Sequence, residues 1–204
     1  MLKKIFTSLF CIFLIASTVS AAPLTYTVQP GDSLWQIAVK NQVGISELIA
    51  ENPQIKNPNL IYSGQKVLLP NMQDIKSQES EVIRLVNIER SKYGLPTLKE
   101  NWELSRVARY KSQDMIDKNY FSHTSPTYGS PFAMMESFGL RFTAAGENIA
   151  MGQRTPQEVV TAWMNSPGHR SNILSPTYIQ IGVGLAKDKN GICYWTQMFI
   201  KPLY

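Results

Sequence analysis

The sequence predicts an α+β protein of two units: a small βααβ unit, then a larger unit in which helices cover an antiparallel sheet. Three observations support this class. Short alternating apolar runs and two short helical patterns fill residues 25–70, longer helical patterns begin at residue 81, and two β runs joined by a turn close the chain. Strands and helices do not alternate as βαβ repeats, so a doubly wound parallel sheet is not expected. Residues 71–80 are polar without apolar periodicity and are predicted to be a linker.

Residues 1–21 have the composition of a secretory signal peptide. Lys3 and Lys4 precede an apolar stretch, and the small residues "VSA" end the segment at 19–21. The apolar stretch is too short to favour a membrane anchor, which is the alternative interpretation. We therefore expect cleavage, with no membrane anchor left in the mature protein.

Charge and cysteine content exclude some classes of protein. Without Lys3 and Lys4 the chain keeps 18 basic against 15 acidic residues, a net charge of +3. No stretch clusters Lys and Arg, so nucleic acid is not an expected partner, whereas an anionic cell wall is compatible. Loss of Cys11 leaves Cys193 alone, so a packed core must replace a disulfide framework.

Residues 25–70 predict a strand, two helices and a strand. The alternating "YTV" and the closing "KVLLP" indicate the strands. The first helix has apolar residues at i, i+3 and i+4, namely Leu34, Ile37 and Ala38. Asp32 or Ser33 is expected to cap it and Gly44 to end it. Ser46 is expected to cap a second helix that stops at the "NP" of residues 52–53.

The stretches "YTVQPGDSLWQIA", "NP" and "LIYSGQKVLLP" make this whole unit resemble a LysM domain. LysM domains bind glycans that contain N-acetylglucosamine, so the resemblance implies binding to peptidoglycan or chitin. Backbone groups of two loops would pair with acetamido and hydroxyl groups of the sugar. The residues expected at this groove are Gly31, Asp32, Ser33, Leu34, Asn52, Pro53 and Ile61. A purely structural role in turns and caps is the alternative for Gly31 and Asp32.

The second unit is expected to begin with two long helices, the first from residue 81 to "GLP" and the second over residues 102–118. A short helix at "SPFAMMESFG" and a short strand or loop at "TAAGENIAMG" follow. Thr155 caps a third helix, with Pro156 at its first position, and Pro167 with Gly168 should stop it. The runs "YIQIGVGLA" and "ICYWTQMFI" flank "KDKNG" and predict a hairpin.

The motifs "SHTSP", "GENIA", "VVTAWMNSPGHRSNIL", "IGVGLA" and "YWTQMF" make residues 81–202 resemble the CAP superfamily of cysteine-rich secretory, antigen 5 and pathogenesis-related proteins. The resemblance implies an α-β-α sandwich with a central cavity. LysM followed by CAP is similar to bacterial, Bacillus-type wall and sporulation proteins. This implies a secreted protein of the cell wall or spore envelope.

The family cavity is lined by two histidines and two acidic residues. His123 in "SHTSP" matches the first histidine, and Glu147 in "GENIA" matches the first acidic residue. Tyr194 stands where animal and plant members have the second histidine, and Ser166 stands at the second acid. His169 is expected to replace the missing histidine. His123, Glu147 and His169 are therefore the candidate catalytic residues and the candidate ligands of a divalent metal such as zinc.

Other arrangements remain open at this point. The two histidines would otherwise bond loop backbone, and the sequence has neither an HExxH nor a GxSxG motif. Ser122 beside His123 is a poor nucleophile–base pair, because adjacent residues in an extended segment point opposite ways. Cys193 is expected in the core and Glu136 on a solvated helix face.

Three functions fit these patterns: a non-enzymatic wall-bound binding protein, a wall-associated hydrolase using the His/Glu cavity, and a structural protein of a spore or envelope layer. LysM targeting is compatible with all three. A second proton-transfer group in the cavity would favour the hydrolase, and the sequence shows none. The family resemblance alone does not imply enzymatic activity.

Overall fold

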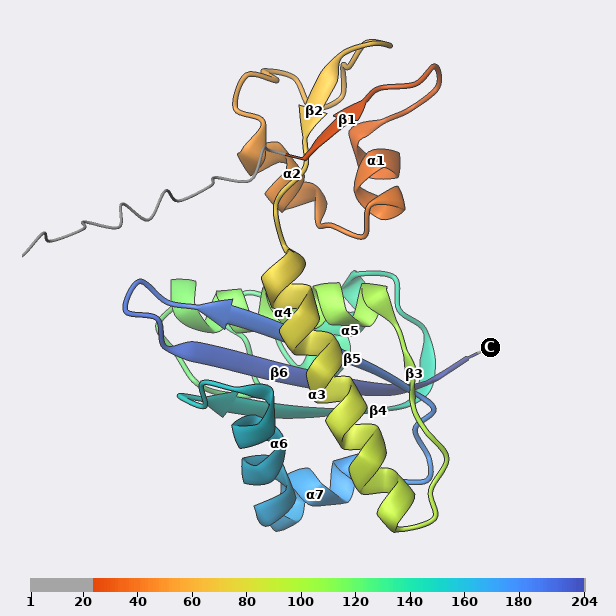
Figure 1. Cartoon of the computed structure of the whole chain (residues 1–204), viewed down its shortest axis with the longest axis vertical. Coiled ribbons are helices and arrows are strands. Elements are labelled where there is room, and N and C mark those ends of the chain that lie inside the picture. Colours follow the sequence, from red (N-terminus) through yellow and green to blue (C-terminus); the bar gives the residue numbers. More distant parts are fainter. Residues whose placement is uncertain (1–23, 204) are drawn as a thin grey trace, which may run out of the picture.

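The computed structural model describes residues 24–203 (Figure 1). The predicted signal peptide and Cys11 lie outside these residues. Within them, no helix combines the length and the apolar character needed to cross a membrane.

The first unit has the predicted βααβ order. Its elements are β1 (Thr25–Thr27), α1 (Leu34–Lys40), α2 (Ile45–Glu51) and β2 (Lys66–Leu68), and the two strands pair antiparallel. Ser33 caps α1, because its side chain accepts the Gln36 N–H while Gln36 Oε1 accepts the Ser33 N–H. Gly44 is the N-cap of α2, so the prediction of Ser46 in that role was wrong. Ser46 lies inside the first turn instead.

The predicted linker is mostly helical, because α3 (Gln73–Lys92) begins inside residues 71–80. Glu79, which belongs to this stretch, is buried and bonds Arg109 Nε at 2.8 Å. It also accepts the N–H of Leu185 at 3.0 Å. The side of these turns that faces the core is thus partly polar, which is why an apolar period was missing from the sequence.

The second unit supplies the remaining elements. These are β3 (Lys99–Glu100), α4 (Trp102–Asp117), α5 (Pro131–Ser137), β4 (Phe142–Met151), α6 (Pro156–Asn165), α7 (Pro167–Ile173), β5 (Gln180–Lys187) and β6 (Cys193–Pro202). The sheet order is β3-β5-β6-β4, with β5 and β6 forming the predicted hairpin. The two-residue β3 pairs parallel with β5, so the sheet is mixed at that edge and antiparallel elsewhere.

Helices cover both faces of this sheet (Figure 1). On one face α3, α6 and α7 enclose a core that includes Trp163, Trp195 and Phe199. On the other face α4 and α5 enclose a second core around Met134 and Met198. The α-β-α sandwich expected for this unit is therefore confirmed.

The motif "IGVGLA" explains how α4 lies so close to the sheet. Ile181, Val183 and Leu185 belong to the α3-side core. Gly182 and Gly184 point to the opposite face, because side chains alternate along a strand. A Cβ on Gly184 would lie 2.0 Å from the backbone nitrogen of Arg109, and a Cβ on Gly182 would lie 2.4 Å from the backbone of Leu104. Only glycine leaves room for α4 at these positions.

Two further predictions need correction. Pro167 and Gly168 do not simply end a helix, since they form the first turn of α7, in which His169 is the third residue. The segment "TAAGENIAMG" is not a short strand or loop but most of the ten-residue β4. It pairs with β6 along its length, and the strand order places it at one edge of the sheet.

Candidate functional site

His123 and Glu147 come together at the β4 edge of the sheet. Glu147 pairs in register with Met198 and so points toward the α4 side. His123, in the loop after α4, places its Nδ1 2.7 Å from Glu147 Oε1. The histidine side chain is 54% exposed and the glutamate side chain 1% exposed. The pair therefore joins a buried carboxylate to an imidazole that solvent can reach.

One oxygen of this carboxylate is left without a partner. Glu147 Oε2 is buried and makes no hydrogen bond to any residue of the described range 24–203. A buried unpaired acceptor is unfavourable, so such atoms are uncommon and often mark a binding position. The arrangement can accept a hydrogen bond from a ligand hydroxyl or N–H group beside the His123 ring.

Two polar residues of α4 hold the loop that carries His123. Lys111, fully buried, donates from Nζ to the His123 carbonyl at 2.9 Å and to the Tyr120 hydroxyl at 3.0 Å. Asp114 accepts hydrogen bonds from the hydroxyls of Ser125 and Thr127 at 2.7 and 2.6 Å. Burial raises the pKa of Asp114, but these hydrogen bonds and that from Tyr120 outweigh it and leave the pKa lowered. The helix thus fixes the loop at both ends.

The pKa values of the pair reflect its surroundings. The hydrogen bond from His123 to Glu147 raises the pKa of the imidazole, although partial burial and the charge of Lys111 oppose this. Burial raises the pKa of Glu147, against the hydrogen bond to His123 and the charge of Lys111. Burial also lowers the pKa of His169, with a contribution from the charge of His123. The two imidazoles therefore lie near enough to influence each other.

His169 does not complete a metal site with this pair. Its backbone carbonyl accepts a hydrogen bond from Asn148 Nδ2 at 3.0 Å, and Asn148 points to the opposite face of β4 from Glu147. Among residues 24–203, no group of three or more His, Cys, Asp or Glu side chains is placed to hold a metal ion. The donor set does not fit zinc, which requires at least three protein ligands. The three-ligand site of His123, Glu147 and His169 therefore stays a prediction that the described residues do not support.

Other candidates behave as the sequence indicated. The Ser122 hydroxyl accepts the Thr124 N–H, while the imidazole beside it bonds Glu147 rather than the serine. Cys193 is buried in the α3-side core, and Glu136 is exposed on α5. None of these three supplies a nucleophile or a second acid next to Glu147.

The predicted glycan-binding residues divide into two groups. Leu34 and Asn52 are buried, with exposed fractions of 2% and 1%. Asn52 donates to the carbonyls of Leu48 and Leu68 and accepts the Leu68 N–H. These two side chains therefore shape the loops and cannot contact a sugar. The accessible members are Gly31, Asp32, Ser33, Pro53 and Ile61, of which Asp32 and Ile61 are partly buried.

Comparisons with known proteins agree with this geometry. The model of the Cysteine-rich secretory protein family matches residues 83–199, and that of the LysM domain matches residues 26–70. The chain belongs to the CAP family, with a LysM domain before the CAP domain. The Bacillus subtilis protein YkwD is 57% identical over 126 residues, which are 62% of this chain and 48% of YkwD. YlbC, from the same organism, is 35% identical over 70% of this chain and 41% of its own length.

Solved CAP proteins share the fold. An extracellular protein with an SCP domain from Bacillus anthracis aligns with a TM-score of 0.59 and 34% identity, over 68% of this chain and 47% of that one. For the LysM domain, the secreted LysM effector Mgx1LysM of Zymoseptoria tritici is 48% identical over 50 residues, 23% of this chain and 51% of the effector. This chain spans about half or less of the length of YkwD and YlbC.

Sequence reasoning missed several residues of the two domains. In the CAP domain it missed Lys111 and Asp114, because polar residues in a predicted helix are normally assigned to the face exposed to solvent. In the LysM domain it missed Tyr62, which is 64% exposed in the loop before β2. The tyrosine itself was the available signal, since tyrosine is enriched at binding interfaces.

The two histidines of this CAP protein are expected to titrate on opposite sides of 6.5, with the pKa of His123 above it and that of His169 below it. Stability contributed by His123 is present below pH 6.5 and is lost as the pH rises through its folded pKa. Stability contributed by His169 is present above pH 6.5 and is lost as the pH falls through its folded pKa. NMR of the imidazole protons measures both values, because the chain has only 2 histidines.

The Glu147→Gln variant tests the cause of the His123 shift. Removing the carboxylate should bring the pKa of His123 down, whereas the exposed Glu136→Gln control should leave it unchanged. An unaltered His123 titration in Glu147→Gln would show that the pair does not form in solution.

Proposed function

We propose that this chain is a secreted, cell-wall-associated binding protein rather than an enzyme. Its LysM domain docks to peptidoglycan or another glycan containing N-acetylglucosamine, and its CAP domain presents the His123–Glu147 pair to a ligand or partner. The proposal that the LysM domain binds a glycan rests on the exposure of four residues on two of its loops, namely Gly31, Ser33, Pro53 and Tyr62. Exposed backbone groups and an aromatic ring suit a sugar with acetamido and hydroxyl groups.

The CAP half of the proposal rests on the unpaired Glu147 Oε2. This buried oxygen, beside the accessible ring of His123, would accept a hydrogen bond from a small polar ligand. Ligand sites commonly combine an enclosed polar atom with a reachable opening. The chemistry favours a ligand or partner group that carries a hydroxyl or an N–H donor.

A wall hydrolase is the second candidate, and the raised pKa of Glu147 favours it, because a general acid must keep its proton near neutral pH. Asp114, the carboxylate that holds the His123 loop, is not suitable as the second acid. It has a lowered pKa and both of its oxygens accept hydroxyl hydrogen bonds. Hydrolysis of a glycoside usually needs two free carboxyl groups.

A structural role in a spore layer is the third candidate. SpoIVD-associated factor A of Bacillus subtilis is 46% identical over 46 residues, and the spore coat assembly protein ExsA of Bacillus cereus is 44% identical over 46 residues. These matches have about the length of the LysM domain. They support a location at the wall or spore envelope more than any activity of the CAP domain.

Peptidoglycan sedimentation tests the proposal. We expect the full chain to pellet with purified peptidoglycan and residues 71–204 alone to remain in the supernatant. Tyr62→Ala should weaken binding roughly tenfold, the effect of losing an aromatic anchor. Tyr93→Ala is the matched control, since Tyr93 is a similarly exposed tyrosine of the CAP domain, at 52%.

The same samples separate the candidate functions. A binding protein leaves no soluble muropeptides in the supernatant. Muropeptide release that disappears in Glu147→Gln would instead establish the hydrolase, and equal sedimentation of residues 71–204 would contradict the role given to the LysM domain.

A further inference from the structure

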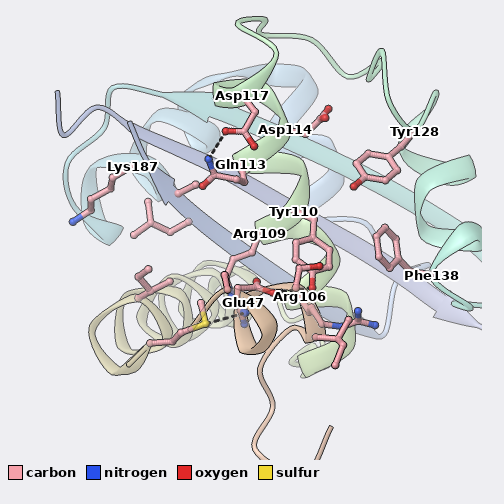
Figure 2. Close-up of a pocket in the computed structure, with 17 residues that line it drawn as sticks. Glu47, Arg106, Arg109, Tyr110, Gln113, Asp114, Asp117, Tyr128, Phe138 and Lys187 are labelled. Atoms are coloured by element: carbon pink, nitrogen blue, oxygen red, sulfur yellow. Dashed lines mark hydrogen bonds between the residues drawn. The ribbon is translucent and has the colours of Figure 1, made fainter. Parts of the chain in front are cut away.

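A cavity of about 680 Å³ lies where the LysM and CAP domains meet (Figure 2). Its walls come from α2, from the start of α3, from α4 and from the end of β5. Neither the His123–Glu147 pair nor the glycan-binding loops line it. Its volume falls within the ~300–1,000 Å³ typical of small-ligand sites.

Direct contacts hold the two domains together at this cavity. The Tyr110 hydroxyl of α4 donates to Glu47 Oε2 of α2 at 2.9 Å, and Lys76 Nζ of α3 donates to the Asn41 carbonyl at 3.2 Å. The N-terminus of α2 approaches α4 closely, since a Cβ on Gly44 would lie 2.1 Å from the Tyr110 hydroxyl. The cavity therefore has walls from both domains.

One end of the cavity is aromatic. Figure 2 shows Tyr110, Tyr128 and Phe138 grouped there. The ring centroids of Tyr110 and Phe138 are 5.3 Å apart, and those of Tyr128 and Phe138 are 5.7 Å apart. All three residues are partly buried, so part of each side chain remains accessible. The Arg106 guanidinium lies over two of these rings, 5.7 Å from the Tyr110 centroid and 5.4 Å from the Phe138 centroid. The ring surface that it leaves accessible, including that of Tyr128, is where the flat apolar face of a ligand can pack.

The polar lining carries an unpaired donor and charged residues of both signs. Arg106 Nε is buried and has no hydrogen-bond partner within the described part of the chain. Among the other charged residues of the lining, Arg109 pairs with Glu79, and Glu47 accepts a hydrogen bond from the Tyr110 hydroxyl. Gln113 and Asp117 bond each other at 2.8 Å along the rim. Because the lining has as many acidic residues (Glu47, Asp114, Asp117) as basic ones (Arg106, Arg109, Lys187), the cavity favours a ligand without net charge that offers a hydrogen-bond acceptor to Arg106.

We propose that this cavity is a second saccharide site, which takes an acetamido sugar of the glycan that the LysM domain binds. A pyranose ring has an apolar C–H face for the aromatic group and hydroxyls for amide and carboxylate side chains. An acetamido carbonyl supplies the acceptor that Arg106 Nε lacks. The inference rests on the proposed function, and it gives the chain two attachment points on one polymer, which raises the effective affinity for the wall.

Saccharide titration of the full chain by NMR tests the proposal, with a soluble tetramer of N-acetylglucosamine as the probe. In the wild type we expect two sets of shifted resonances, one in the LysM loops and one from Tyr110, Tyr128 and Phe138. Ala50→Trp fills the cavity from an exposed position on α2 and should abolish the second set alone, while Ala50→Ser serves as its control. Arg106→Met removes the donor. The affinity measured from the second set of resonances should then fall at least roughly tenfold.

The outcomes distinguish this inference from the proposed function. If the LysM resonances shift and the cavity resonances do not, the second site is overturned and the proposed function stands. If Tyr62→Ala lowers the affinity measured from the LysM resonances and leaves that measured from the cavity resonances unchanged, the two sites are independent and the inference is supported. Shifts of the cavity resonances with a short wall-derived peptide, but not with the sugar, would replace the saccharide with a peptide and overturn the inference.

Discussion

Gly184→Ala is expected to lower the free energy of unfolding by about 3 kcal/mol, at the upper end of the range for overpacked positions. The added Cβ would lie 2.0 Å from the nitrogen of Arg109 and 2.2 Å from the carbonyl carbon of Ala108. These are backbone atoms of α4, so no side-chain rotation relieves the clash and the helix must move away from β5. Thermal unfolding followed by circular dichroism should show the midpoint falling by roughly 6–12 °C.

Gly168→Ala is the matched control for this substitution. Gly168 lies in α7, and a Cβ there would meet nothing within 4 Å. The control should be neutral or slightly stabilising, because alanine is the better helix former. Equal midpoints for the two variants would show that the contact between α4 and β5 is looser than the structure indicates.

Arg90→Met is expected to destabilise the protein by about 3 kcal/mol or more and to loosen α7. Arg90 is 1% exposed. Its guanidinium donates to the carbonyls of Pro96, Ile173 and Ser175 at 2.9, 2.7 and 2.8 Å. Methionine fills similar space but leaves three carbonyl groups without their donor, and each buried unpaired group costs ~1–3 kcal/mol. Denaturant unfolding measures the loss.

Hydrogen exchange adds a local measurement to this second prediction. Ile173 and Ser175 lie at the end of α7, so the amides of the helix that carries His169 should exchange faster in Arg90→Met. Arg84→Met is the control on the same helix, because Arg84 is 58% exposed and pairs only with Glu81 at the surface. Unchanged exchange in α7 would show that Arg90 does not anchor this helix.

The order of elements was largely predictable because it depends on local signals. These signals involve residues that are close in sequence. They include the caps at Ser33 and Thr155, the periodicity of α4 and the hairpin turn between β5 and β6. Where the local signal was polar, as at Glu79, the first turns of α3 were missed. The partner that makes helical burial possible there, Arg109, lies 30 residues away.

The candidate site was predictable only in part. Family motifs pointed to His123 and Glu147, and the structure brings these two together. Motifs did not indicate that Asn148 would hold the backbone carbonyl of His169. The side to which a strand residue points depends on register, which the hydrogen bonds between β4 and β6 set.

The sequence by itself determined the two domains, their family and the residues that meet in the His123–Glu147 pair, because these follow from motifs and local periodicity. Only the tertiary structure decided that Leu34 and Asn52 are internal, that Lys111 and Asp114 hold the His123 loop, and that a cavity lies between the domains. Burial and pairing of polar groups depend on contacts between segments far apart in the chain. No local pattern carries that information.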